Sequence, residues 1–119
     1  MKYASARSLL LAVGVTLSPI VAWNADAAPQ EVYHLAIVNQ AFVPDTLTIP
    51  AGQAVKIMVM NKDTMPAEFE STDLKRETVI PGKTELPVYV RSLEPGTYHF
   101  FNDFHPQSKG TLIVKKAGQ

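Results

Sequence analysis

The sequence contains no cysteine among its 119 residues. Disulfide bonds are therefore excluded, although small exported domains often depend on them for stability. Metal sites that require a thiolate ligand are excluded for the same reason. A folded domain of this chain must rely on buried apolar side chains and paired strands, with added stability from any ligand that binds its native state.

Long apolar runs are missing as well. The longest, "SLLLAVGVTLSPIVAW", is interrupted by Pro19 and is shorter than the roughly 20 residues that a bilayer-spanning helix needs. It follows a basic start and precedes the small residues of "NADAAPQ", a pattern typical of a secretory signal peptide. We expect cleavage after Ala27, so that residues 1–27 are a signal peptide and residues 28–119 form one exported domain.

The chain also lacks an excess of either charge and lacks the common catalytic motifs. Without residues 1–27, nine basic and ten acidic side chains remain, which gives no electrostatic support for binding nucleic acid or anionic lipid. No G-x-S-x-G, H-E-x-x-H or phosphate-cradling glycine loop is present. Composition and motifs therefore argue against a hydrolase or a transferase.

Short apolar runs separated by Pro and Gly are what the sequence does contain. Residues 54–61 alternate with a period of two, which is typical of a central strand, and only residues 71–77 could hold a helical turn. This pattern predicts an all-β, antiparallel Greek-key sandwich or barrel of seven to eight strands. The expected strands are 31–39, 46–50, 54–61, 67–71, 77–80, 84–90, 97–101 and 111–116.

Two stretches carry residues of the kinds that bind metals. "NKDTMPAEFESTDL" follows a central strand, and "FNDFHPQSKG", which we expect to be a loop, lies near the end of the chain. Loops distant in sequence can meet at one end of a Greek-key sandwich, and imidazole with carboxylates suits Cu(II), Fe and Zn. The candidate metal ligands are Met65, Glu68, Glu70, Asp103 and His105.

Each candidate also has an interpretation without metal. His105 could bond to backbone, Asp103 could shape an Asx-turn, and Met65 could fill space. Glu68 and Glu70 lie on one face of an expected strand, where they could be ordinary surface charge. The remaining strand residues of these kinds are predicted to pack or to lie at the surface without metal: Met58, Met60, His34 and His99.

"FVPDTLTIPAGQAVKIMVMNKD" and "PGTYHFFNDFHPQSKGTLIV" resemble the two halves of the cupredoxin family, and this resemblance spans nearly the whole exported domain. Aligned with the closing motif P-G-x-Y-x-[FY]-x-C-x-x-H-x-x-M-x-G, the family's cysteine ligand falls on Asn102 and its methionine ligand on Ser108. Its second histidine is retained as His105, and its first histidine falls on Ala67. The resemblance therefore implies a cupredoxin fold without a blue type 1 copper centre.

"EFESTDLKRE" together with "EPGTYHFFNDFHP" is similar to the small periplasmic cupredoxin-like components of bacterial iron-uptake systems, of the FtrB and EfeO types. That resemblance implies a periplasmic protein that binds copper or iron at a carboxylate-rich site. It also implies two partners, a periplasmic companion protein that binds copper or iron and an inner-membrane iron permease. At most, the protein would assist a ferroxidase reaction.

The alternative is a metal-free module in the periplasm that keeps the cupredoxin shape and serves only for docking. The absence of three of the family's four ligands favours this alternative. Uptake of Cu(II) or iron distinguishes the two, because a ligand that binds only the native state raises the melting temperature.

Overall fold

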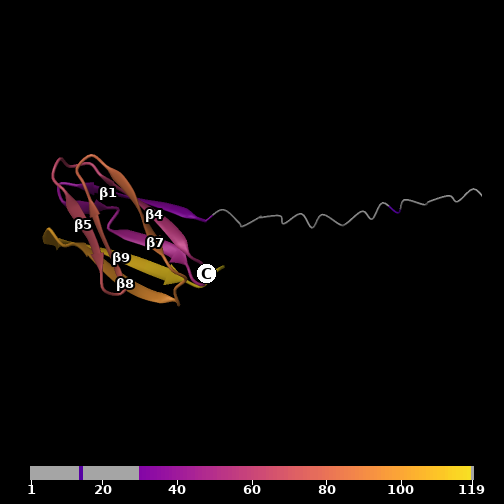
Figure 1. Ribbon diagram of the computed structural model, residues 1–119. Helices are drawn as coiled ribbons and strands as arrows, with labels where there is room; N and C mark the ends of the chain where they lie inside the picture. Colours follow the sequence, from indigo (N-terminus) through magenta and orange to yellow (C-terminus); the bar gives the residue numbers. More distant parts are fainter. Residues whose placement is uncertain (1–13, 15–29, 119) are drawn as a thin grey trace, which may run out of the picture.

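The computed structural model describes Gly14 and residues 30–118, which form nine strands (Figure 1). The predicted signal peptide of residues 1–27 lies outside this part of the chain, apart from Gly14. Among the described residues, no helix has the length and apolar character needed to cross a bilayer. The strands are β1 (Val32–Val38), β2 (Ala41–Val43), β3 (Thr46–Pro50), β4 (Val55–Asn61), β5 (Ala67–Ser71), β6 (Arg76–Ile80), β7 (Glu85–Val90), β8 (Gly96–Asn102) and β9 (His105–Lys115).

The strands form two sheets that face each other as a sandwich. The four-stranded sheet has the order β2-β1-β4-β7, and the five-stranded sheet has the order β3-β9-β8-β5-β6. The all-β sandwich predicted from the sequence is therefore confirmed, with nine strands in the described residues where seven to eight were predicted. The expectation of purely antiparallel pairing is wrong, because β1 pairs with β4 and β3 pairs with β9 in parallel.

The alternation of side chains explains why the two sheets close on each other. In β4, Val55, Ile57 and Val59 are fully buried, whereas the residues between them are only partly covered. Strands β1, β8 and β9 alternate in the same way, so each sheet turns one apolar face inward. Burial of these inner faces is the main source of stability in a chain without disulfides.

Three phenylalanines form the aromatic part of this core. The ring centroid of Phe100 lies 4.9 Å from that of Phe42 and 4.9 Å from that of Phe69. Such pairs contribute about 0.5–1.5 kcal/mol each beyond simple area burial. Gly110 on β9 is required beside them, because a Cβ there would lie 2.1 Å from the Phe100 ring.

Two local differences from the predicted strands affect the site. Residues 41–43 form β2, a strand too short to produce a periodic pattern in the sequence. The segment expected to be a loop, 101–110, is instead a tight hairpin, in which Asn102 pairs with His105 and β9 runs on from there. The aromatic strand and the final strand are thus one continuous antiparallel pair with a bulge at Phe101 and Asn102.

Candidate functional site

The hairpin of β5 and β6 brings three glutamates onto one face of the five-stranded sheet. Glu70 lies directly opposite Glu77 in the antiparallel register, and Glu68 lies two residues away along β5. Phe69 between them is fully buried in the core, so both β5 glutamates face outward, as the sequence predicted. Residues 72–75 form the turn, not a helical turn, and Lys75 adopts a positive φ of 54° there.

The three carboxylates are close enough to hold one ion together. One carboxylate oxygen from each of Glu68, Glu70 and Glu77 lies within 4.8 Å of the others. Among the described residues, these three are the group of His, Asp and Glu side chains that meets this spacing. Glu68 is only 6% exposed, Glu70 is half-buried and Glu77 is exposed, so an ion would enter from the side of Glu77.

Burial and mutual repulsion disfavour charge on these carboxylates. Burial raises the pKa of Glu68 to about 7, helped by a hydrogen bond to Glu77 and by the negative charges of Glu77, Asp103 and Glu70. Burial also raises the pKa of Glu70, with further contributions from Glu77 and Asp103. A bound cation would relieve this repulsion, because an opposite charge nearby favours the ionised form of a carboxyl group.

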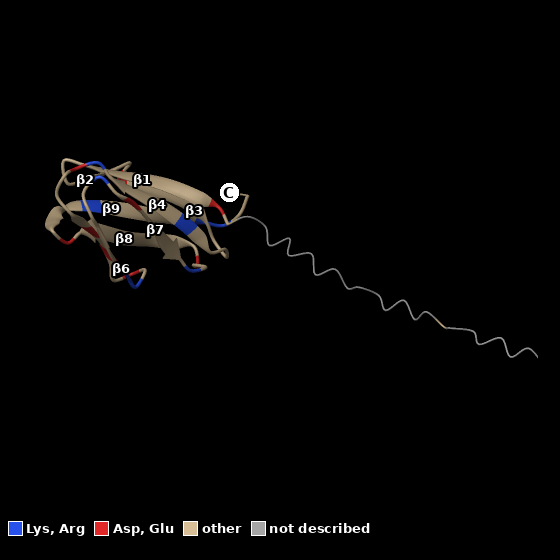
Figure 2. Cartoon of the chain, turned by 45° about the horizontal axis from the view of Figure 1, so that its top comes forward, with Lys and Arg blue, Asp and Glu red and all other residues tan. Residues whose placement is uncertain are grey.

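Two basic residues lie beside the cluster. Lys75 and Arg76 line the same surface hollow as Glu70 and Glu77. The guanidinium of Arg76 donates to the carbonyl oxygen of Tyr89, at 2.6 Å, and this hydrogen bond holds the side chain toward β7. Over the whole sandwich, basic and acidic residues are scattered on both sheets (Figure 2).

Asn102, at the position of the family's cysteine, is a structural residue. It is 1% exposed, and its Oδ1 accepts the backbone N–H groups of Glu68 at 3.1 Å and Phe104 at 3.2 Å. Its Nδ2 donates to the carbonyl oxygen of Gln40 at 3.2 Å. Because the amide satisfies three backbone groups from three segments, it ties this end of the sandwich together.

His105 and Ser108, at two further ligand positions of the family, bond to each other. His105 Nδ1 and Ser108 Oγ share a hydrogen bond of 2.9 Å, and both side chains are half-buried. Ala67, at the fourth position, is buried in the core. The family's four ligand positions are thus occupied by a core alanine, an amide bonded to backbone, and a histidine and a serine bonded to each other.

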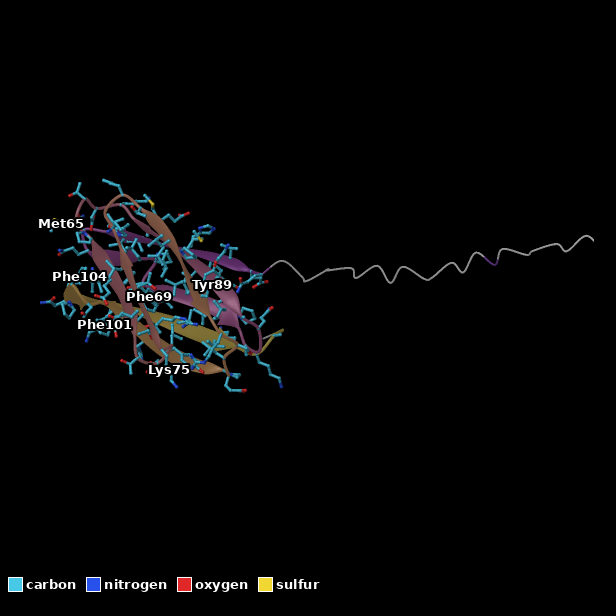
Figure 3. All side chains as sticks on the ribbon, viewed as in Figure 1. Met65, Phe69, Lys75, Tyr89, Phe101 and Phe104 are labelled. Atoms are coloured by element: carbon cyan, nitrogen blue, oxygen red, sulfur yellow. The ribbon has the colours of Figure 1, made fainter. Side chains whose placement is uncertain are left out.

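The predicted candidates are therefore divided between two places. Asp103 donates its backbone N–H to the carbonyl oxygen of Glu68, at 3.1 Å, so the two predicted stretches do meet. The three-carboxylate group nevertheless consists of β5 and β6 residues and contains neither Asp103 nor His105. Met65 is 65% exposed and lies with Phe104 at the end of the sandwich away from the start of β1 (Figure 3).

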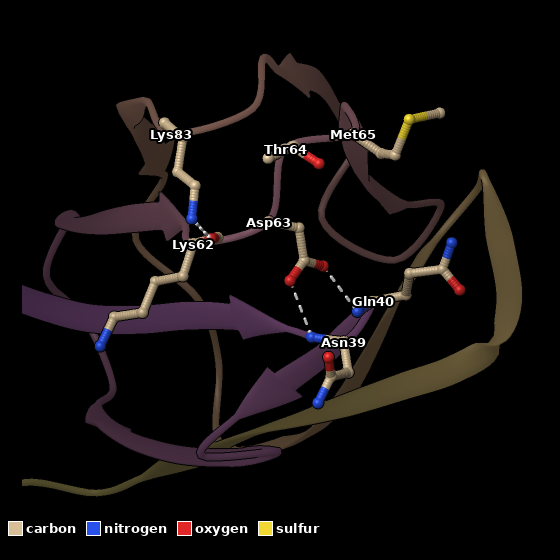
Figure 4. A pocket seen from close by; sticks show the side chains of 7 residues that line it. All are labelled: Asn39, Gln40, Lys62, Asp63, Thr64, Met65 and Lys83. Atoms are coloured by element: carbon tan, nitrogen blue, oxygen red, sulfur yellow. Dashed lines mark hydrogen bonds between the residues drawn. The ribbon is translucent and has the colours of Figure 1, made fainter.

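Met65 belongs to a separate pocket formed by the loops at that end. The carboxylate of Asp63 accepts the backbone N–H groups of Asn39 and Gln40, at 2.9 and 2.8 Å, and so fixes the turn between β1 and β2 (Figure 4). Both turn residues have positive φ, which this pair of bonds stabilises. Lys83, which also lines this pocket, donates to the carbonyl oxygen of Lys62.

Glu77 is the member of the cluster that sequence reasoning missed. The residue lies at the start of an expected strand, but its proximity to Glu70 depends on the register of the hairpin. A four-residue turn at 72–75 sets that register. The available signal was the short turn "TDLK" between two expected strands, because a hairpin closed there pairs Ser71 with Arg76 and therefore Glu70 with Glu77.

Comparison with known proteins agrees with this architecture. The sequence pattern of the cupredoxin-like domain matches residues 9–114. The chain belongs to the cupredoxin-like family. An uncharacterised protein of Rickettsia prowazekii (strain Madrid E) is 32% identical over 81 residues, which are 67% of this chain and 65% of that protein. The chain thus spans about two thirds of the length of this curated relative.

Solved structures show the same fold at low sequence identity. A purple cupredoxin from Nitrosopumilus maritimus has a TM-score of 0.56 at 22% identity, covering 70% of this chain and 99% of its own. Amicyanin from Paracoccus versutus has a TM-score of 0.59 at 20% identity, covering 73% and 84%. The metal-binding domain of the Cu(I)-exporting ATPase CopA of Streptococcus pneumoniae has a TM-score of 0.62 at 14% identity, covering 71% and 85%.

The residues of this cupredoxin-like domain do not fit a thiolate copper centre. The chain contains no cysteine, and the amide at position 102 is committed to three hydrogen bonds. What the domain offers instead is an acidic group of three carboxylates on the outer face of β5 and β6. Any resident metal at that group would be held by oxygen.

Proposed function

We propose that this protein is a periplasmic cupredoxin-like component of a ferrous-iron uptake system that binds iron at Glu68, Glu70 and Glu77. The observation that carries the proposal is the approach of three carboxylates to within 4.8 Å of one another, one of them nearly buried. Such oxygen donors prefer hard cations, in contrast to the soft thiolate of a blue copper site. The export signal predicted at residues 1–27 supports a periplasmic location.

The same donors favour the ferric over the ferrous state. Anionic oxygen ligands stabilise Fe(III) more than Fe(II), so a bound ferrous ion is easier to oxidise. Loss of one electron from Fe(II) requires an acceptor, and reduction of O₂ to water requires four electrons. We therefore assign the electron to a companion protein that binds copper or iron, and the oxidised ion to an inner-membrane permease.

Calorimetric titration of the protein with Fe(II), without oxygen, tests this proposal. We expect one iron per chain, and we expect the double substitution Glu70→Gln with Glu77→Gln to weaken binding at least about tenfold. Gln keeps the size of the side chain and removes the charge. A parallel titration with Cu(II) shows whether the site distinguishes the two ions.

Glu94→Gln is the matched control, because Glu94 is exposed and lies outside the cluster. It removes one negative charge outside the cluster, where the double substitution removes two within it, and should leave iron binding unchanged. An unaltered protein that binds neither ion at micromolar concentration, or a double variant that binds iron as tightly as the original, would overturn the carboxylate site.

The second candidate is a metal-free docking module, and the bonding at the end of the sandwich favours it. Asn102, His105 and Ser108 direct their polar atoms at partners within the chain. A domain in which the family's metal pocket is bonded in this way can retain the fold for another use. Absence of iron and copper uptake by the folded protein would select this function.

A further inference from the structure

The outer face of the four-stranded sheet carries a second group of side chains of the kinds that bind metals. The glutamates of β5 and β6 lie on the other sheet. His34 on β1 pairs with Met58 on β4, and Ala36 pairs with Met60. Residues in register on adjacent strands present their side chains on the same face of a sheet. His34, Met58 and Met60 are therefore neighbours on one surface.

The exposure of the two methionines shows that they do not pack in the core between the sheets. Met58 and Met60 are half-covered, and they alternate with Ile57 and Val59, which are fully buried. His34 is exposed and alternates in the same way with buried Leu35. The prediction that Met58 and Met60 are packing residues thus does not account for their place on the outward side of the sandwich.

The spacing suits ligation of one ion. Paired residues on adjacent strands are about 4.8 Å apart, and residues two apart in a strand are about 6.7 Å apart. Methionine has three rotatable bonds beyond its backbone, so two thioether sulfurs and one imidazole can converge above such a triangle. Ala36 beside Met60 and Pro87 beside Met58 offer no competing ligand, whereas Glu85, which is exposed, pairs with Met60 from β7. Lys56 lies on the same face of β4, two residues before Met58.

We propose that His34, Met58 and Met60 form a binding site for a soft monovalent ion of the Cu(I) class. Thioether sulfur selects Cu(I) over hard cations, and imidazole is compatible with copper in general. The site lies on the sheet opposite the one that carries Glu68, Glu70 and Glu77. The two proposed sites share no residue, so each binds its ion independently of the other.

Titration with Ag(I), a redox-inert substitute for Cu(I), tests this site in chloride-free buffer. In protein labelled with ¹³C at the methionine methyl groups, the signals of Met58 and Met60 should shift together and saturate at one ion per chain. Their assignment comes from the single substitutions Met58→Leu and Met60→Leu. The double substitution should weaken Ag(I) binding at least about tenfold, and His34→Gln should weaken it by a smaller factor.

Met65→Leu is the matched control, because Met65 is the exposed loop methionine at the end of the sandwich. It should leave Ag(I) binding unchanged, as should the pair Glu70→Gln with Glu77→Gln, which removes the proposed iron site. Methyl shifts confined to Met65, or none at Met58 and Met60 when Ag(I) is in excess, would overturn the proposal. The methyl measurement on the unaltered protein decides this even if a variant folds poorly.

Discussion

Two regions of this domain carry side chains that commonly bind metals, and they differ in how those side chains are satisfied. At the end of the sandwich, the amide of Asn102 makes three hydrogen bonds to backbone, and His105 is bonded to Ser108. On the outer face of β5 and β6, Glu68 is nearly buried, and carboxylate oxygens of Glu70 and Glu77 lie within 4.8 Å of its own. The polar side chains of the first region are paired within the chain, whereas the second region contains carboxyl groups that repel one another when ionised.

The difference separates a region whose polar side chains are bonded within the chain from a region of adjacent carboxyl groups. Replacing thiolate by an amide converts a ligand into a structural tie, because the amide can both accept and donate. Gathering three carboxylates produces the opposite situation, in which each group raises the pKa of the others. Under the proposed function, a cation would be bound by the carboxylates of the second region, whereas the amide of Asn102 in the first region is already committed to three hydrogen bonds.

The largest expected effect comes from removing the structural tie. Asn102→Ala leaves the backbone N–H groups of Glu68 and Phe104 and the carbonyl of Gln40 without partners inside the protein. Each unsatisfied buried group costs about 1–3 kcal/mol, so we expect a loss of about 3 kcal/mol in the free energy of unfolding. Urea denaturation followed by circular dichroism measures it.

Asn102→Asp is the matched comparison for this tie. Its carboxylate still accepts from the two backbone N–H groups but cannot donate to the Gln40 carbonyl. The variant also places a carboxyl group at a position that is 1% exposed, so its loss should be smaller than that of the alanine variant at acidic pH, where the group is neutral, and should grow as pH rises. A loss below about 0.5 kcal/mol for Asn102→Ala would contradict the structural role given to this residue.

An intermediate effect is expected from pH acting on the carboxylate region of the metal-free protein. The pKa of Glu68 is raised to about 7 from its ordinary 4.5, so the folded state holds a proton that the unfolded state releases between these values. Stability should therefore fall as pH rises from about 4.5 through about 7, because the unfolded state binds fewer protons there. Thermal melting across this range measures the trend.

Glu68→Gln should remove most of that trend. Gln cannot ionise, so the variant should be more stable than the original protein at pH 8, by of the order of 1 kcal/mol, and similar to it at pH 5. Glu94→Gln, which changes an exposed carboxylate elsewhere, should follow the original curve. A variant of Glu68 with the same pH dependence as the original would show that this carboxyl is not the titrating group.

The smallest effect is expected at His105. Ser108→Ala removes one half-buried hydrogen bond to Nδ1, which should lower the free energy of unfolding by about 0.5–1 kcal/mol. Nitrogen NMR of the imidazole should show loss of a single fixed tautomer. If His105 instead binds a cation, added iron would shift its ring signals even in the Ser108→Ala protein, and the contrast between the two regions would be lost.

Much of the sandwich was predictable from alternation and turn residues. Strands β3 and β5 have the bounds that the sequence predicted, because Pro and Gly mark the ends of short apolar runs. The parallel pairing of β1 with β4 was not predictable, because alternation identifies a buried face and not a partner strand. The strand beginning at His105 was missed because "FNDFHPQSKG" looks like a metal-binding loop around a single histidine, whereas pairing with β8 makes it a tight hairpin.

The carboxylate site was predictable only in part. Alternation alone places Glu68 and Glu70 on one face with Phe69 behind them. Glu77 required the hairpin register, and the burial of Glu68 required knowledge of neighbouring strands. Assignment of His105 and Asp103 to the same ion as the glutamates stays a prediction.

The central claim is that a hard cation binds at β5 and β6 and not at the end of the sandwich, and Mn(II) tests it most directly. This paramagnetic ion prefers oxygen ligands and broadens NMR signals of nearby residues. At substoichiometric Mn(II), we predict that the amide signals of Glu68, Glu70 and Glu77 broaden first. First broadening at His105 and Ser108, or uniform broadening over the whole protein, would contradict the claim.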